Sequence, residues 1–366
     1  MKQYYFSIIF FTLNLFAQAQ SPVGSSTEVG ITEGQLSVSL TGGANYVVPI
    51  SVPQGIDKVE PKVSLTYNSQ GGNGIAGFGW EISGVSSIKR IASSKFHDGT
   101  IDPVDFNSMD RYALDGQRLI LKTGVYGGDR AEYETEIFSN LRITSYGVHS
   151  NGSKYGPQYF KVEYPNGSIA IFGNSADSRS IMEWSITTWE NSKGVRINYQ
   201  YTASNNNLTI SSIKYGALSN GSPINEIQFS YENRKRPEQF YIGGESILKN
   251  SLLKTIKIFT NSIGYRNYSL GYDETYRDYQ RLINLTEKNG DNSKSYNPTV
   301  FKYGDLADTS TVNLTPATLG LSNIDYETMG NLSGDFDGDG NPDIILYRKT
   351  TSEAKKKYWV YKNILA

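Results

Sequence analysis

The chain has 366 residues, with 35 Lys and Arg against 36 Asp and Glu, two His and no Cys. The near-zero net charge gives no global field to attract nucleic acid or an anionic membrane, and the lack of cysteine excludes disulfides, thiol nucleophiles and Cys-ligated zinc. Thirty-six Gly and 27 Tyr with only 19% charged residues favour a β-rich fold over a coiled coil or helical bundle.

The N-terminus has the features of a secretory signal peptide. Lys2 precedes an apolar run at 4–16, YYFSIIFFTLNLF, which is followed by the small-x-small sequence Ala17-Gln18-Ala19. The run is too short to cross a hydrocarbon core about 30 Å thick. We therefore expect residues 1–19 to be a signal peptide, the chain to be exported to the cell surface or medium, and no stable membrane insertion.

Beyond residue 20 the pattern predicts a series of short antiparallel strands. Apolar and polar residues alternate in five segments: 62–67, 160–164, 195–201, 227–231 and 268–272. Five turn-forming pairs are expected to close hairpins: Asp98-Gly99, Asp115-Gly116, Asn166-Gly167, Asn220-Gly221 and Asn289-Gly290. No window of twelve or more residues has a strong helical period. The expected fold is all-β, a large antiparallel shell-like domain built of meanders.

A change of amino-acid composition near residue 305 predicts a domain boundary. Ser, Thr, Asn and Asp dominate residues 305–323, and an acidic motif with a following apolar strand comes after them. We expect a β domain over 20–304, a linker over 305–325, and over 326–366 the start of a β-propeller-type blade.

The acidic motif is DFDGDGNPD at 335–343, with carboxylates at loop positions one, three, five and nine and Gly at position six. This spacing curls a loop around a hard cation. We predict one structural Ca²⁺, bound by the side chains of Asp335, Asp337, Asp339 and Asp343 and by the backbone carbonyl of Asn341. Leu346 replaces the Glu of an EF-hand, so we expect a weak site, about 10⁻⁴ to 10⁻³ M. The alternative is a solvated Asp-rich turn.

Other motifs give no catalytic assignment. Gly72-x-Gly74-x-x-Gly77 fits a dinucleotide fingerprint, but a strand pattern follows where a nucleotide site needs a helix. We read it as a glycine-rich turn between packed strands, with Trp80 buried beside it. His97 and His149 are interpreted as solvated loop residues.

Two charged motifs are also interpreted as structural. Glu134-x-Glu136 superficially resembles the acidic pair of ADP-ribosyltransferases, but charge alternation along a strand explains it. The lysines at 355–357 are interpreted as a solvated hairpin. We predict no catalytic residues, no bound cofactor other than Ca²⁺, and no enzyme activity.

An ordered string of motifs carries a family resemblance. The segments are GQLSVSL at 34–40, VPISVPQG at 48–55, PKVSLTYNS at 61–69, GNGIAGFGW at 72–80, IKR at 88–90, DRYALDGQRL at 110–119 and NPTVFKY at 297–303. The string resembles the N-terminal domain of the Salmonella virulence plasmid B (SpvB) family and of insecticidal toxin-complex B components of the TcaC type. The acidic loop is similar to an FG-GAP/VCBS calcium repeat.

The resemblance implies a hollow β-shell related to RHS proteins, which holds a toxic C-terminal fragment, with a propeller that docks on a partner. We therefore expect a secreted, non-enzymatic structural component whose partners are other toxin-complex or RHS subunits, or a toxic fragment encoded elsewhere. The alternative is a cell-surface adhesin or glycan-binding module, in which exposed Tyr and Trp would stack on sugars. An enzyme, either an ADP-ribosyltransferase or a hydrolase, is the third possibility.

Overall fold

The computed structural model describes residues 30–274, 279–304, 328–338, 343–349 and 358–362. The predicted signal peptide and linker and the lysines at 355–357 lie outside these ranges. The chain divides into two compact units, Met1–Lys302 and Tyr303–Ala366, and each is described by itself. Among the described residues, no helix is both long enough and apolar enough to cross a membrane.

The predicted all-β, antiparallel fold is confirmed. Within the described ranges the one α-helix is α1 (Lys95–Asp98), and two short 3₁₀ turns occur at Ile56–Lys58 and Ser153–Tyr155. The first unit contains a four-stranded sheet, a fifteen-stranded sheet and the small pair β4 (Asn73–Gly74) and β5 (Gly77–Phe78). Sequential strands are neighbours through most of the large sheet, as expected for meanders.

Part of the large sheet closes into an eight-stranded barrel, which the sequence analysis did not predict. Its strands are β7 (Ser87–Ile91), β8 (Arg111–Leu114), β9 (Gln117–Thr123), β10 (Glu132–Thr135), β11 (Arg142–Tyr146), β12 (Tyr159–Glu163), β13 (Ile169–Phe172) and β14 (Glu183–Glu190). Each strand pairs with the next, and β14 closes the ring by pairing with both β13 and β7. An eight-stranded barrel is just wide enough to be filled by its own side chains.

Aromatic side chains fill the barrel. Trp184 lies 5.2 Å from Tyr112 and 5.3 Å from Phe160 between ring centroids, both in edge-to-face geometry. The Trp184 indole N–H donates to the carbonyl of Pro157 at 3.0 Å, so its one polar atom is satisfied inside the core. The barrel is therefore a packed body rather than a pore.

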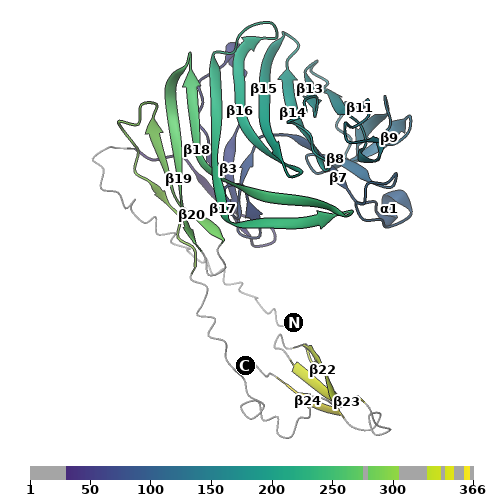
Figure 1. Ribbon diagram of the computed structural model, residues 1–366. Coiled ribbons are helices and arrows are strands. Elements are labelled where there is room, and N and C mark those ends of the chain that lie inside the picture. The colour runs from purple at the N-terminus through teal and green to yellow at the C-terminus, as the bar shows by residue number, and fades with distance from the viewer. Residues whose placement is uncertain (1–29, 275–278, 305–327, 339–342, 350–357, 363–366) are drawn as a thin grey trace, which may run out of the picture. The chain divides into compact units, whose positions relative to one another are not determined.

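The remaining strands of the large sheet form a broad wall (Figure 1). They are β15 (Val195–Ser204), β16 (Asn207–Leu218), β17 (Asn225–Ile242), β18 (Glu245–Thr260), β19 (Ile263–Glu274), β20 (Gln280–Asn289) and β21 (Thr299–Val300). The four-stranded sheet packs against one face of this wall. It consists of β1 (Gln35–Val38), β2 (Ala44–Pro49), β3 (Ser64–Asn68) and β6 (Trp80–Ser83).

The two faces of the wall differ in chemistry. Ile213, Ile227 and Ile258 are cross-strand neighbours on the covered face, and none of the three is exposed. On the opposite face, a row crosses six strands through Gln200, Ser212, Gln228, Lys257, Asn267 and Lys288. A second row runs through Ser230, Thr255, Ser269 and Thr286. We call the face of the wall that carries these two rows the polar face.

Trp80 is buried where the small sheet meets the wall, as predicted. Its side chain is 1% exposed, and its ring lies 4.7 Å from that of Phe301. A side chain at Gly74 would place its Cβ 2.0 Å from the carbonyl oxygen of Trp80, so only glycine permits this approach. The motifs at 72–80 and 297–303 thus meet in one core.

In the part of the chain that the structure describes, four two-residue hairpin turns have positive φ at both central positions, as type I′ requires. Asp115-Gly116 joins β8 to β9, as the sequence predicts. The other three, which the sequence analysis missed, are Asn205-Asn206, Gly243-Gly244 and Asn261-Ser262. The predicted turns at 166–167 and 220–221 lie between strands, and Asn289 ends β20 with its carbonyl accepting from Asn292 N–H.

The hairpin of β17 and β18 extends beyond the wall (Figure 1). Residues 234–237 form a bulge, after which the pairing continues from Glu238 with Lys249 to the turn. At the turn, a Cβ on Gly243 would lie 2.8 Å from the Cα of Asp105, and the Tyr155 hydroxyl donates to the carboxylate of Glu245. The tip of the hairpin is therefore docked against loops of the barrel.

The second unit contains a three-stranded antiparallel meander. Its strands are β22 (Met329–Gly334), β23 (Asp343–Arg348) and β24 (Tyr358–Tyr361). Gly334 pairs with Asp343, so the acidic loop connects β22 to β23. Three strands fit part of a four-stranded propeller blade, and assignment to a propeller remains a prediction.

Candidate functional site

The acidic loop brings three of the predicted calcium ligands together. One carboxylate oxygen from each of Asp335, Asp337 and Asp343 lies within 4.8 Å of the others. Ca²⁺ binds oxygen at about 2.3–2.6 Å, so ligands on opposite sides of one ion are about 5 Å apart. The spacing of these oxygens therefore fits a shared ion. Asp339 and Asn341 lie outside the described residues.

The loop holds these carboxylates with its own backbone. Asp335 Oδ1 accepts a hydrogen bond from Gly338 N–H at 2.7 Å, and Asp343 Oδ2 accepts from Phe336 N–H at 2.9 Å. Asp343 is fully buried, whereas Asp335 and Asp337 are exposed. A curled loop with one buried and two exposed carboxylates has the donor set that a hard cation prefers.

A lysine competes for the same position. Lys362 Nζ lies 2.9 Å from Asp337 Oδ2, and both side chains are accessible to solvent. The ammonium group neutralises part of the acidic cluster. Because Ca²⁺ would meet this positive charge, Lys362 is expected to weaken its binding.

The first unit contains a buried ion pair between two of the family motifs. Arg90 Nη1 lies 2.7 Å from Asp110 Oδ2, and both side chains are 1% exposed. Arg90 Nε also donates to the carbonyl of Ile181 at 3.1 Å, and Asp110 accepts from the N–H groups of residues 105 and 106. In the sequence these motifs carried a family resemblance but no assigned role. Their contacts show that the buried ion pair holds the two segments together at one end of the barrel.

The predicted hairpin turn at Asp98-Gly99 is wrong. Asp98-Gly99 does not close a hairpin: Asp98 ends α1, and Gly99 is its left-handed C-cap. The Asp98 carboxylate contacts Arg118 and accepts from Arg111 Nε at 2.7 Å. Burial opposes ionisation of Asp98, but the Ser94 backbone N–H and Arg111 outweigh it and lower its pKa.

The two histidines differ from each other. His149 is 4% exposed, so its interpretation as a solvated residue is wrong. Burial first, and then Arg179, lower the pKa of His149 to about 4, which keeps the ring neutral at pH 7. The ring packs 6.2 Å from Trp184, and the polar flanking sequence gave no sign of this burial.

His97 lies in a contact set that resembles a hydrolase triad. Its Nδ1 is 2.9 Å from Ser94 Oγ, and its Nε2 is 2.9 Å from Glu136 Oε1. The same Ser94 hydroxyl accepts from His97 N–H at 3.3 Å and caps α1. A capping serine three residues before its partner explains this arrangement, so we assign it to helix capping. Glu134 on β10 pairs with Lys122 at 3.2 Å, consistent with charge alternation along a strand.

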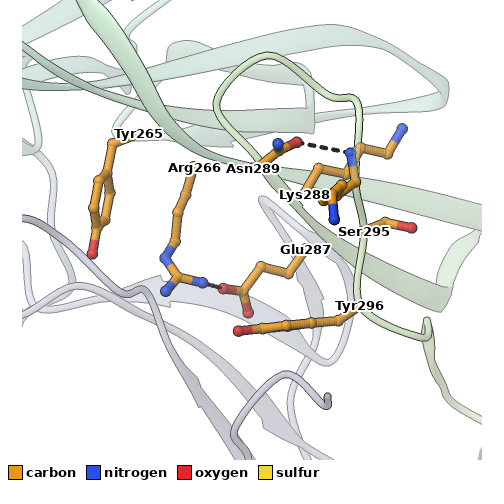
Figure 2. Close-up of a pocket in the computed structure, with 8 residues that line it drawn as sticks. Tyr265, Arg266, Glu287, Lys288, Asn289, Ser295 and Tyr296 are labelled. Carbon is orange, nitrogen blue, oxygen red and sulfur yellow. Dashed lines mark hydrogen bonds and ion pairs between the residues drawn. The ribbon is translucent and has the colours of Figure 1, made fainter. Parts of the chain in front are cut away.

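A pocket of about 290 Å³ lies where β19 begins and β20 ends (Figure 2). The ion pair of Arg266 and Glu287 lies between Tyr265 and Tyr296. The sequence analysis did not predict this pocket, because its residues come from two strands and the loop that follows.

Solved structures share this fold. The structure titled TcdB2-TccC3 matches with a TM-score of 0.61 and 16% identity, over 97% of this chain and 20% of that one. A Photorhabdus luminescens Tc holotoxin pore gives 0.61 and 14%, over 93% and 19%. The N-terminal domain of the effector SpvB from Salmonella typhimurium strain LT2 gives 0.52 and 16%, over 70% and 99%. The chain spans about a fifth of the length of TcdB2-TccC3. These likenesses define an all-β domain of the kind found in toxin-complex components.

The family assignment comes from the sequence. Residues 38–216 match the family model SpvB, described as Salmonella virulence plasmid 65kDa B protein. The chain therefore carries an SpvB-family domain, as its ordered motifs predicted. A search of the curated proteins finds no match to this sequence.

Proposed function

We propose that the chain is a secreted, non-enzymatic wall component of a toxin-complex or RHS-type system. The observation that carries the proposal is the two-faced wall. Its apolar face is covered by the four-stranded sheet, whereas its opposite face carries one polar row across six strands and a second across four. Such a surface can lie beside a non-native polypeptide and bind its apolar side chains only weakly, because its rows offer little apolar area to bury. The fold similarity to toxin-complex components supports this role.

Partner identity tests the proposal. The chain would be purified from the medium of its native cells, and co-purifying polypeptides would be identified by mass spectrometry. We expect an RHS-type or toxin-complex subunit in stoichiometric amount, and no consumption of NAD⁺ by the purified chain. A chain that is recovered without any such subunit, or that consumes NAD⁺, would contradict this function.

Export of the chain belongs to the same proposal. Lys2, the apolar run at 4–16 and Ala17-Gln18-Ala19 support cleavage after Ala19. N-terminal sequencing of the exported protein should begin at or near Gln20. A cytoplasmic product that retains the early apolar run would contradict export.

We further propose that the acidic loop binds one structural Ca²⁺. The ligands would be Asp335, Asp337, Asp339 and Asp343 through their side chains, and Asn341 through its carbonyl. The convergence of the three described carboxylates supports the site. Bound Ca²⁺ would stabilise the pairing of β22 with β23, since an ion that binds only the folded loop adds to its stability.

Calorimetric titration tests this site in two directions. Asp337→Ala should abolish saturable Ca²⁺ binding, whereas Lys362→Gln should tighten it by removing the competing ammonium group. Lys257→Gln, which changes a lysine of the first unit, is the matched control and should leave binding unchanged. No heat at about 10 mM Ca²⁺, ten times the weak end of the expected range, would refute the site.

A further inference from the structure

The pocket in Figure 2 shares one residue, Lys288, with the polar rows of the wall, and its other lining residues lie outside those rows. It is lined by Tyr265, Arg266, Glu287, Lys288, Asn289, Lys294, Ser295 and Tyr296. A second pocket of about 250 Å³ shares Arg266, Glu287 and Tyr296 with it and adds Glu33, Ser51 and Tyr268. The first pocket is at the small end of the size range of ligand sites, roughly 300 Å³, which suits a ligand of one ring.

The polar centre of the pocket is held in place by the fold. The Glu287 side chain is 6% exposed and forms an ion pair with Arg266. The Arg266 guanidinium lies 5.4 Å from the ring centroid of Tyr265, and Tyr296 N–H donates to the carbonyl of Glu287 at 2.9 Å. The guanidinium and the two phenol rings are therefore positioned before any ligand arrives, which lowers the entropic cost of binding.

The lining is cationic and aromatic at once. Arg266, Lys288 and Lys294 carry three positive charges against the one carboxylate of Glu287, a net charge of two positive. Tyr265 is 37% exposed, and Figure 2 shows Tyr265 and Tyr296 on either side of the ion pair. Aromatic faces are electronegative and attract C–H groups, while cationic donors bind carboxylates through charge-assisted hydrogen bonds.

We propose that this pocket binds an acidic saccharide unit, a pyranose that carries a carboxylate. The C–H face of the sugar would pack on a tyrosine ring, its hydroxyls would bond Asn289 and Ser295, and its carboxylate would lie among the cationic side chains. A bare anion would leave the rings unused, and a neutral sugar would leave the charge unused. The site is independent of the wall function, so either can fail without the other.

Three matched probes test the proposal on the purified chain by calorimetry and saturation-transfer NMR. Glucuronate should bind with a Kd near 1 mM, whereas glucose, which lacks the carboxylate, and acetate, which lacks the ring, should each bind at least about tenfold more weakly. Tyr296→Ala should lose glucuronate binding, and Tyr296→Phe, which retains the ring, should keep it. The double variant Lys288→Gln with Lys294→Gln should weaken glucuronate by about tenfold or more, the value of one charge-assisted bond.

Controls separate a binding defect from unfolding. Each variant must melt within a few degrees of the parent, and Lys257→Gln on the polar face should bind glucuronate normally. Glucose binding as tightly as glucuronate, or acetate binding as tightly, would overturn the proposal. So would unchanged glucuronate binding in both the Tyr296→Ala and the double-lysine variants, or no saturable binding at about 10 mM, ten times the expected Kd.

Discussion

The barrel and the wall share one sequence pattern but bury their apolar sides in different ways. Both consist of antiparallel strands in which apolar and polar residues alternate. In the barrel, closure gives every strand two neighbours, and the apolar side of each strand points into a filled interior. In the wall, the apolar side needs a separate four-stranded sheet to cover it, and the polar side forms an extended surface. The barrel thus provides a compact anchor, and the wall provides area.

One strand makes this difference possible. Glu183–Ser185 of β14 pairs with β7 inside the barrel, and Thr188–Glu190 pairs with β15 of the wall. Along its other edge β14 pairs with β13. A single strand therefore belongs to both bodies, and the docked tip of the β17–β18 hairpin provides a second link between them.

The largest expected effect comes from breaking the buried ion pair of Arg90 and Asp110 at the end of the barrel. Asp110→Ala would leave Arg90 buried without its carboxylate, and losing one partner of a buried pair costs about 3–5 kcal/mol. Chemical denaturation should show this loss in the free energy of unfolding. Lys193→Ala, which removes the partner of Asp57 in an exposed pair, is the control and should cost about 1 kcal/mol or less. Equal losses would show that burial of the first pair contributes nothing.

In the wall, the corresponding test is Trp80→Ala. It removes a fully buried indole between the small sheet and Phe301, and we expect a loss of about 3 kcal/mol. Thermal melting should detect it, and Trp80→Phe should recover part of the loss. A variant that melts like the parent yet loses a small ligand would make this region a binding site instead.

The stability of the barrel should depend on pH, because both histidines of the sequence lie in the part of the chain that forms it. The pKa of His149 is lowered from 6.5 to about 4, so the unfolded chain binds a proton more readily than the folded one. The stabilisation that comes from the neutral His149 ring is complete above pH 6.5 and is lost as the pH falls towards 4. At pH 5 the free energy of unfolding should be lower by about 2 kcal/mol.

Denaturation measured at pH 7 and pH 5 tests this dependence. His149→Gln should remove this part of the pH dependence, although it should also lower stability at pH 7 by disturbing the packing. His97→Gln is the control, because His97 lies on the surface contact with Glu136. A parent chain that is equally stable at the two pH values would contradict the burial of His149.

The smallest expected effect concerns the polar face. Lys257→Leu changes an exposed position in the row of polar residues, so stability should change by no more than about 0.5 kcal/mol. The variant should instead self-associate, because it places an apolar side chain on a surface that has few. Sedimentation velocity would measure this, and a monomeric variant with a large loss of stability would show that the face is packed.

The sequence predicts the strands better than it predicts their partners. Alternation in 195–201 and 268–272 is local, so it indicates strands and identifies the side that is buried. Closure of β14 on β7 depends on pairing between residues about 95 positions apart, such as Glu183 with Lys89, which no local period encodes. For the same reason the pocket around Arg266 and the burial of His149 escaped prediction, whereas the acidic loop, contained in nine residues, did not.

Crosslinking the chain to its co-purified partner tests the central claim most directly. An amine-reactive reagent and mass spectrometry would locate the contacts on lysines of the first unit. If the partner contacts the polar face, crosslinks should concentrate on Lys257 and Lys288, the two lysines of its rows. Lys95 and Lys122 of the barrel region should react with the reagent without becoming linked to the partner. Crosslinks that map to the barrel lysines and spare both polar-face lysines would contradict the account.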